Sequence, residues 1–351
     1  MLKSILQWSE IDLEKGLGGV EVCAREIARG LEKKGCGVFY SSDLTEINGG
    51  SHDAVITHGS SFPINRRIPK SKTWIHILHG TTLGRMIACR EFFWLRGYYA
   101  YFKEVFATIK ADVLISVNAG LHLIWIRRLL RKKTIVQWNG WDTSDDAGSQ
   151  SVKSQKVKNG GSLSSRSPAI ENPYFVFIGR SHDSVKNAEL IESCFTGNYD
   201  FDLAVVPGFE MAGLENGQLP RIHNLGSMNS KEIKTLLGGS IGLLVLSKYE
   251  GCPIVVMEAL SEGVSVVATG VGALPEIAEK SMGLIITKPE REEVIQTLRL
   301  LAKDGITKSE KSDRKKFNRA ILPPWEKFAK AVLDAILDDK SGVDMTERKP
   351  K

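Results

Sequence analysis

The stretch that decides the fold spans residues 249–277 and reads YEGCPIVVMEALSEGVSVVATGVGALPEI. It follows an apolar run, Ile241–Leu246, whose β-branched and leucine side chains are typical of a buried strand. Proline is favoured at the first helical position, so Pro253 predicts that a helix starts there. A second apolar run, Ser265–Ala268, predicts the next strand. Strand, helix and strand in this order indicate an α/β fold with a parallel sheet.

Two carboxylates of this stretch flank the expected helix start. Glu250 falls in the loop between strand and helix, and Glu258 falls in the second helical turn. The free backbone N–H groups near Ile254 and Val255, with the positive end of the helix dipole, suit a phosphate group. The carboxylates are then left to accept hydrogen bonds from sugar hydroxyls. The alternative is that both are surface glutamates at a helix start, where carboxylates are common.

A second motif favours the phosphate interpretation. The sequence FVFIGRSHDSVKN, residues 175–187, puts Arg180 at the end of a predicted strand and Lys186 at the start of the next helix. Ligands of doubly wound sheets bind at the carboxyl ends of strands, and two cations there suit a diphosphate without a metal ion. Solvated surface charge is the alternative. Because the two motifs supply matching halves of one site, we favour a diphosphate site.

The first half of the chain repeats the same alternation of strands and helices. Five short apolar runs predict its strands: Ser4–Trp8, Ala54–Thr57, Trp74–Leu78, Val113–Val117 and Thr134–Gln137. The glycine-rich loop KGLGGVE, residues 15–21, lets backbone approach a ligand closely, but it lacks the G-x-G-x-x-G and P-loop patterns. A dinucleotide site or an ATPase is therefore not supported. His79, at a strand end, could contact the same ligand, although such a histidine is more often structural.

The domain organisation follows from a change in composition. Residues 143–172 hold eight Ser and three Gly without an apolar period, which predicts a linker. Five further strands are expected after it, at 174–178, 203–206, 241–246, 265–268 and 284–287, and a helix over 325–337. The predicted organisation is an N-terminal domain (1–142), the linker (143–172), a C-terminal domain (173–324), a terminal helix (325–338) and a disordered tail (339–351).

Composition excludes several classes of protein. The chain has 351 residues, 42% of them hydrophobic and 25% charged, which is typical of globular domains. Its five cysteines form no C-x-x-C pair, so neither a zinc site nor a disulfide framework is expected. No signal-like or membrane-spanning apolar run occurs, and we expect a cytoplasmic protein. Asp200-Phe201-Asp202 spells the D-x-D of a metal site, but it leads into a core strand and is interpreted as a turn.

Basic charge is concentrated in the first half. Residues 66–133 hold 14 Lys and Arg but only three Asp and Glu, within a chain of net charge +6. Aromatic residues crowd the segment from Phe92 to Phe106, and the cationic sequence LHLIWIRRLLRKK follows at 121–133. Aromatic and cationic helices suit an anionic membrane, so residues 85–133 are a candidate membrane surface. Alternatively the aromatics are core and the cations solvated. Nucleic acid is not expected as a partner, because no recognised module accompanies the charge.

Taken together, the motifs resemble the retaining GT-B glycosyltransferases of family 4, also known as group 1. The resemblance runs through most of the chain in this order: GGVE at 18–21, LHG at 78–80, NGWD at 139–142, GRSHDSVKN at 179–187, IHNLGSM at 222–228, EGCPIVVMEAL at 250–260, GALPEI at 272–277 and PPWEKFAK at 323–330. It implies two facing Rossmann-like domains with a nucleotide-sugar in the cleft between them. It also implies a C-terminal helix that crosses back to the first domain.

The resemblance implies a role for each candidate residue. Arg180 and Lys186 would hold the donor diphosphate, and Glu258 the ribose hydroxyls. Glu250 and His79 would contact the transferred sugar. The backbone N–H of Gly19 would lie near the diphosphate or the acceptor, beside the N–H groups of Ile254 and Val255 already assigned to phosphate, and Leu225 would lie near the base. Gly80, where many members have Asp, Asn118, where Ser is common, and Val206-Pro207-Gly208, in place of a double glycine, are departures that affect the sugar and acceptor contacts.

The implied activity is transfer of a sugar from a nucleoside diphosphate to a hydroxyl group with retention of configuration. UDP-sugars are favoured as donors and GDP-mannose comes next; no metal or other cofactor is expected. The expected acceptor is a lipid-linked, lipopolysaccharide or other cell-surface glycan, reached from the inner face of the cytoplasmic membrane. A GT-B epimerase or hydrolase of nucleotide-sugars and a non-enzymatic, membrane-associated carbohydrate-binding protein remain as alternatives.

Overall fold

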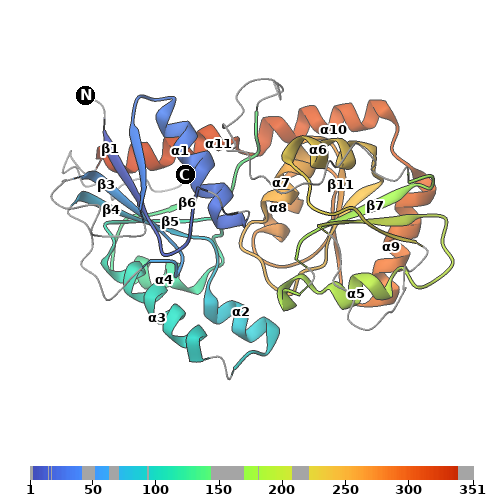
Figure 1. Ribbon diagram of the computed structural model, residues 1–351, viewed down its shortest axis with the longest axis horizontal. Helices are drawn as coiled ribbons and strands as arrows, with labels where there is room; N and C mark the ends of the chain where they lie inside the picture. The colour runs from blue at the N-terminus through green and yellow to red at the C-terminus, as the bar shows by residue number, and fades with distance from the viewer. Residues whose placement is uncertain are drawn as a thin grey trace, which may run out of the picture.

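The computed structural model describes residues 3–14, 16, 18–41, 52–62, 71–92, 95–143, 170–180, 182–207 and 221–338. It contains two six-stranded parallel sheets, each flanked by helices (Figure 1). All strand pairings within both sheets are parallel, as expected when helices connect successive strands. The predicted α/β architecture with two doubly wound halves is confirmed.

The first sheet has the strand order β2-β1-β3-β4-β5-β6. Its strands are β1 (Ser4–Trp8), β2 (Gly37–Ser41), β3 (His52–His58), β4 (Ser71–Leu78), β5 (Val113–Ser116) and β6 (Thr134–Val136). Its helices are α1 (Gly19–Glu32), α2 (Thr82–Cys89), α3 (Leu95–Lys110) and α4 (His122–Leu129). The five predicted strands are present. The sequence analysis missed β2, an edge strand whose half-buried residues lack a clear alternation of apolar and polar side chains.

The second sheet has the order β12-β11-β10-β7-β8-β9. Its strands are β7 (Tyr174–Ile178), β8 (Asp202–Val206), β9 (Ile222–Asn224), β10 (Gly242–Val245), β11 (Ser265–Thr269) and β12 (Leu284–Thr287). Its helical segments are η1 (Ser184–Lys186), α5 (Ala188–Ser193), α6 (Ser230–Gly239), α7 (Ile254–Ser261), α8 (Leu274–Lys280), α9 (Arg291–Asp304) and α10 (Lys308–Ile321). Neighbouring strands β7 and β10 carry the two motifs that the sequence analysis combined.

The start of α7 differs from the prediction by one residue. Pro253 is the N-cap and Ile254 is the first helical residue. The φ of Pro253, −68°, suits a helix, but its ψ of 123° is extended, so the chain turns into the helix only after it. Glu258 still falls in the second turn, as predicted.

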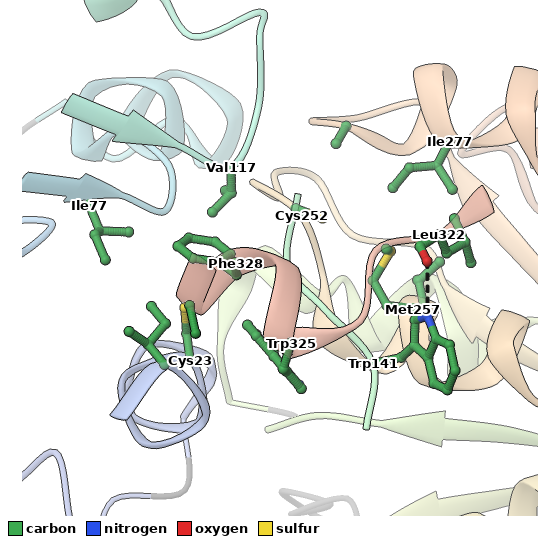
Figure 2. Close-up of a cluster of buried hydrophobic side chains, with 14 of the residues drawn as sticks. Cys23, Ile77, Val117, Trp141, Cys252, Met257, Ile277, Leu322, Trp325 and Phe328 are labelled. Carbon is green, nitrogen blue, oxygen red and sulfur yellow. Dashed lines mark hydrogen bonds between the residues drawn. The ribbon is translucent and has the colours of Figure 1, made fainter. Parts of the chain in front are cut away.

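The last helix, α11 (Trp325–Asp338), packs against α1 of the first half (Figure 1). The contact is so close that a Cβ atom at Gly30 would lie 2.4 Å from the Cβ of Ala329. Just before α11 the chain runs beside Trp141, whose indole N–H donates to the carbonyl of Leu322 at 3.1 Å (Figure 2). The terminal helix is therefore anchored on the first half.

One hydrophobic cluster runs through both halves of the molecule. Ile77 and Cys23 belong to the first half, Met257 belongs to the second, and Phe328 of α11 is part of the same cluster (Figure 2). Burying apolar side chains from both halves in one cluster favours their association. Residues 144–169 of the predicted linker and the predicted tail, 339–351, lie outside the described residues, so the proposed domain boundaries stay predictions.

Asp202 of the D-x-D sequence has a structural role. Asp202 is the first residue of β8 and is buried. Its carboxylate contacts Arg221 at 3.2 Å and His223 at 2.8 Å. The sequence leads into a core strand, as expected, although Asp202 itself belongs to the strand and not to the turn before it.

Candidate functional site

Lys186 and Glu250 meet at the carboxyl edge of the second sheet. Lys186 Nζ donates to Glu250 Oε1 at 2.8 Å, and the hydroxyl of Ser247 donates to the same oxygen at 2.7 Å. The aliphatic part of the Lys186 side chain lies over Gly179: a Cβ atom built on Gly179 would be 3.5 Å from Cδ of Lys186. Glu250 Oε2 has no hydrogen-bond partner among the described residues. The structure therefore brings the two motifs together at one edge of the sheet, and their role in binding a ligand stays a prediction.

The loop that carries Glu250 is held in place from its own domain. The Thr269 hydroxyl donates to the Ser247 carbonyl at 2.5 Å, and the Ala273 N–H donates to the Gly251 carbonyl at 2.8 Å. Gly272 has a φ of +62°, and a Cβ atom there would lie 2.4 Å from the carbonyl oxygen of Glu250. Position 272 therefore needs glycine for both its conformation and its space.

The same loop is also held by the first half of the molecule. The Tyr249 hydroxyl accepts a hydrogen bond from the N–H of Thr81 at 2.6 Å, and the Asn139 side-chain amide donates to the Cys252 carbonyl at 2.6 Å. Between these contacts, a Cβ atom at Gly251 would lie 1.6 Å from the carbonyl oxygen of His79, so the two backbones touch. The sequence analysis missed Tyr249 and Asn139 as site-forming residues, although each lies inside a quoted motif or directly beside one.

Two helix N-termini face each other across this boundary. The N-cap of α1 is Gly18 and that of α7 is Pro253, and neither side chain caps its helix. A Cβ atom at Gly19 would lie 4.0 Å from Cδ1 of Ile254, which places the first residues of the two helices in contact distance. The positive ends of the two helix dipoles thus lie near each other, which favours an anion.

Glu258 lies on α7 beside two other carboxylates. Burial and, to a lesser extent, the nearby carboxylates of Asp142 and Glu26 together raise its pKa to about 7. Its carboxyl group has no hydrogen-bond partner among the described residues, so it is available to a ligand. A carboxyl group with this pKa is partly protonated near pH 7 and can both donate to and accept from hydroxyl groups.

His79 lies at the end of β4, in contact with the Glu250 loop. Its Nε2 is 3.0 Å from Nδ1 of His58, and Nε2 of His58 is 2.7 Å from Oε1 of Gln7. Burial lowers the pKa of His79 to about 4. Burial also lowers the pKa of His58 well below its usual value, and the neighbouring His79 and His76 lower it further. His79 is therefore neutral near pH 7.

The remaining predicted residues differ in how close they lie to this centre. Arg180 lies two residues after the end of β7 and is exposed, and Val255 is half-buried in the first turn of α7. Leu225 follows the edge strand β9, which β8 separates from β7. Its N–H donates to the carbonyl of Val205 at 3.0 Å. Leu225 thus shares the carboxyl edge but lies at its periphery.

The chain is similar to known proteins in part of its sequence and in its fold. Residues 214–321 match the family model described as "Glycosyl transferases group 1". Sucrose-phosphate synthase from Thermosynechococcus elongatus is similar in structure, with a TM-score of 0.73 and 14% identity over 97% of this chain and 100% of that one. No curated protein sequence matches the chain.

Two further solved structures share the fold. A glycosyltransferase from Rickettsia africae ESF-5 has a TM-score of 0.61 and 14% identity over 97% of this chain and 100% of that one. The lipopolysaccharide outer core galactosyltransferase WaaB has a TM-score of 0.56 and 12% identity, with coverage of 96% and 99%. The present protein is a glycosyltransferase, and its residues 214–321 match the group 1 type. Its fold is GT-B.

The glycosyltransferase buries two of the cations that the sequence analysis had placed on a membrane-facing surface. Arg127 is fully buried and donates to four backbone carbonyls, those of Thr108, Ala111, Asp112 and Lys133. Burial lowers its pKa to about 10. Lys103 is buried against Phe62 and Tyr99 and pairs with Glu10 at 2.7 Å. The expectation for these two residues was wrong, because backbone carbonyls and a carboxylate satisfy their charges inside the domain.

Other residues of the same segment are exposed. Leu129 and Leu95 have 84% and 81% of their surface exposed, and Trp125 has 63%. Further large apolar residues with at least a third of their surface exposed lie on α2, α3, α4 and the adjoining turns: Ile87, Phe92, Tyr98, Tyr99, Phe102, Ile109 and Leu130. The three helices pack side by side in the glycosyltransferase (Figure 1). The aromatic residues of this segment are thus not all core, and together these exposed residues form what is called here the apolar helix surface.

Within the described ranges of the glycosyltransferase, no group of three or more His, Cys, Asp or Glu side chains is arranged to hold a metal ion. In the same ranges, no helix has the length and apolar character needed to cross a membrane.

Proposed function

We propose that this glycosyltransferase is a hexosyltransferase that moves a sugar from a nucleoside diphosphate to a hydroxyl group, with retention of configuration. The observation that carries the proposal is the meeting of two uncapped helix N-termini, at Gly19 and Ile254, beside the Lys186–Glu250 pair. These groups form an anion-binding centre between the two halves. A diphosphate matches it in charge, and UDP-sugars are the favoured donors, with GDP-mannose next.

Lys186 and Arg180 would bind the diphosphate. Lys186 is paired with Glu250, so a phosphate oxygen can approach Nζ while Glu250 continues to orient the stem. Arg180 is exposed at the neighbouring strand end and offers a planar guanidinium to two phosphate oxygens. The N–H groups of Gly19, Ile254 and Val255 add donors from both halves.

The sugar and the nucleoside would be held by the other candidate residues. Glu258 has a carboxyl group without a partner among the described residues, which suits the two ribose hydroxyls. Glu250 keeps Oε2 for a hydroxyl of the transferred sugar. His79, in contact with the Glu250 loop, would lie beside that sugar, and Leu225 at the periphery of the edge would contact the base.

The chemistry would depend on electrostatic stabilisation. As the bond between C1 and the phosphate oxygen breaks, negative charge grows on the leaving diphosphate, where Lys186, Arg180 and the α7 N-terminus stabilise it. The acceptor hydroxyl attacks C1 from the side of the leaving group and gives its proton to a phosphate oxygen of the donor. Configuration is retained, and no nucleophilic carboxylate is needed. With two cations and two helix N-termini at the site, we propose that the reaction needs no metal ion.

The acceptor would be a lipid-linked or lipopolysaccharide glycan at a membrane. The apolar helix surface presents residues such as Trp125, Leu129 and Phe102 to solvent, close in sequence to exposed Arg96 and Arg128. Such surfaces bind at the interface of anionic membranes. WaaB, which shares the fold, is itself a galactosyltransferase of lipopolysaccharide. We therefore propose a cytoplasmic enzyme that is peripheral on the inner face of the membrane.

A thermal-shift screen with UDP, GDP and their sugars tests the donor assignment, because a ligand that binds only the folded state raises the melting temperature. We expect one nucleotide to raise it, with or without EDTA. Radiolabelled donor should then be incorporated into lipid-linked glycan. Absence of any nucleotide effect would overturn the donor site. Turnover of donor without acceptor, at the rate seen with it, would instead indicate an epimerase or a hydrolase.

A further inference from the structure

A chain of three buried or half-buried polar side chains ends at the proposed sugar site. It runs from Gln7 on β1 through His58 at the end of β3 to His79 at the end of β4. Gln7 and His58 are fully buried. Burying a polar group costs free energy unless the group is hydrogen-bonded. Here each of the three side chains forms a hydrogen bond with the next one.

The direction of the hydrogen bonds follows from the first member. The side-chain N–H of Gln7 donates to the carbonyl of Ala24 at 2.8 Å, so Oε1 is the atom that faces His58. An amide oxygen only accepts, and therefore Nε2 of His58 carries a proton. Burial keeps His58 neutral, so its Nδ1 is an acceptor. Nε2 of His79 must then be the donor in the 3.0 Å contact between the rings.

The geometry of the two rings supports a true hydrogen bond. Their planes are within 15° of parallel, and their centroids are 5.3 Å apart. With the bonded nitrogens 3.0 Å apart, centroids this distant require both nitrogens to lie between the ring centres. The rings are thus edge to edge, so that the N–H of one points at the in-plane lone pair of the other.

We propose that Gln7 and His58 are positioning residues that hold His79 in the Nε2–H tautomer, so that its Nδ1 accepts a hydrogen bond from a hydroxyl of the transferred sugar. Among the described residues, Nδ1 of His79 has no hydrogen-bond partner. A lone pair there attracts an O–H group and repels phosphate oxygens. The inference rests on the proposed function for the identity of the ligand, but the tautomer is a property of the free protein.

The first test therefore uses the protein without ligand. Long-range ¹H–¹⁵N spectra of ¹⁵N-histidine-labelled protein distinguish the tautomers of its seven histidines, and His79→Asn identifies the signal of His79. We expect the Nε2–H form at pH 7, and a mixture of both tautomers in His58→Phe. A dominant Nδ1–H form in the wild type would overturn the proposal. Thr57→Val is the matched control, because Thr57 neighbours His58 on β3 but bonds His76 and Trp74.

The second test measures transfer from UDP-glucose and from GDP-mannose. We expect His58→Phe and Gln7→Leu each to lower kcat/KM roughly tenfold, the value of one hydrogen bond. His58→Asn, whose Oδ1 can replace the Nδ1 acceptor, should recover part of the loss. In a His79→Ala background, neither His58→Phe nor Gln7→Leu should lower kcat/KM any further. Additive losses there would show a merely structural role.

Donor analogues that lack one sugar hydroxyl complete the design. One monodeoxy analogue should be transferred roughly tenfold more slowly by the wild type, with no such penalty in His79→Ala. The two proposals fail separately. The expected tautomer without any sugar transfer would contradict the proposed function alone, whereas transfer with the wrong tautomer would contradict only the role of Gln7 and His58.

Discussion

The two sides of the boundary between the sheets differ in the way they use charge. The C-terminal side presents Lys186 and Arg180 in the segment that follows β7, and Glu250 forms a hydrogen bond with the lysine. The N-terminal side, which contains the strongly basic stretch 66–133, presents neutral His79 and the N-terminus of α1. Local net charge therefore points to the other half when the proposed phosphate-binding side is sought.

The cations of the N-terminal half have separate roles. Arg127 satisfies backbone carbonyls at the ends of neighbouring segments, and Lys103 joins α3 to Glu10. Others, such as Arg96 and Arg128, are exposed among apolar side chains. The comparison shows that the surroundings of a cation decide whether it stabilises the fold, lies on an exposed surface or is placed to bind a ligand. Each of these roles can be tested separately.

The largest effect is expected on the C-terminal side. Lys186→Ala should lower kcat/KM by about 10²–10³-fold, because it removes a cation placed to stabilise charge on the leaving diphosphate. Steady-state kinetics with the donor found by thermal shift measures this. Lys288→Ala is the matched control, since Lys288 follows the edge strand β12 of the same sheet and is also ion-paired, with Glu293 at 3.9 Å. Equal losses in both variants would remove the assignment of Lys186.

The next effect concerns the surface of the N-terminal side. Replacing Arg96, Lys110 and Arg128 together by Gln should weaken binding to anionic liposomes at low salt by roughly a hundredfold, from about 1 kcal/mol per cation near the membrane. Co-sedimentation with phosphatidylglycerol vesicles measures this. A triple Gln variant of Lys231, Lys303 and Lys308, exposed on the C-terminal side, changes the net charge equally and should bind normally. Unchanged binding of the first variant would exclude the apolar helix surface as the membrane contact.

Much of the fold and part of the site could be predicted from sequence. Lys186 and Glu250 follow strands whose apolar runs are plain, and the carboxyl ends of parallel strands meet at one edge. The contacts of Tyr249 and of Asn139 could not be predicted, because they depend on how the two halves dock. The prediction that Arg127 lies on the membrane-facing surface was wrong, because the sequence pattern of an amphipathic helix is the same whether a cation faces solvent or buried carbonyl groups. The hydrogen-bonded series of side chains from Gln7 to His79 could not be predicted either, because it joins three strands whose order in the sheet cannot be derived from the sequence.

A smaller effect is expected where α11 joins the two sides. Gly30→Ala should destabilise the protein by about 2 kcal/mol, because the new methyl group overlaps Ala329 and outweighs the gain in helix propensity. Thermal unfolding measures the loss, and the exchange variant Gly30→Ala/Ala329→Gly should recover most of it. Donor affinity should stay unchanged, since the affected contact contains no proposed ligand group. If Gly30→Ala were stabilising, α1 and α11 would not pack as closely as described.

The smallest effect compares two glutamates one turn apart near the end of α7. The pKa of Glu258, raised to about 7, means that the folded protein holds its proton more tightly than the unfolded chain, so its carboxylate costs stability as the pH rises from 4.5 through 7. Glu258→Gln should therefore increase the free energy of unfolding at pH 8 by about 1–2 kcal/mol after solvent screening, and have little effect below pH 4.5. A higher melting temperature at pH 8 would show this increase.

Glu262 provides the contrast. Burial raises the pKa of Glu262, but hydrogen bonds from Lys315 and Lys234 outweigh it and leave that pKa below its usual value. Glu262→Gln should thus lower the melting temperature at pH 8, and the loss should fade as the pH falls through the pKa of Glu262. Shifts of the same sign in both variants would show that Glu258 lacks the carboxylate-rich surroundings assigned to it.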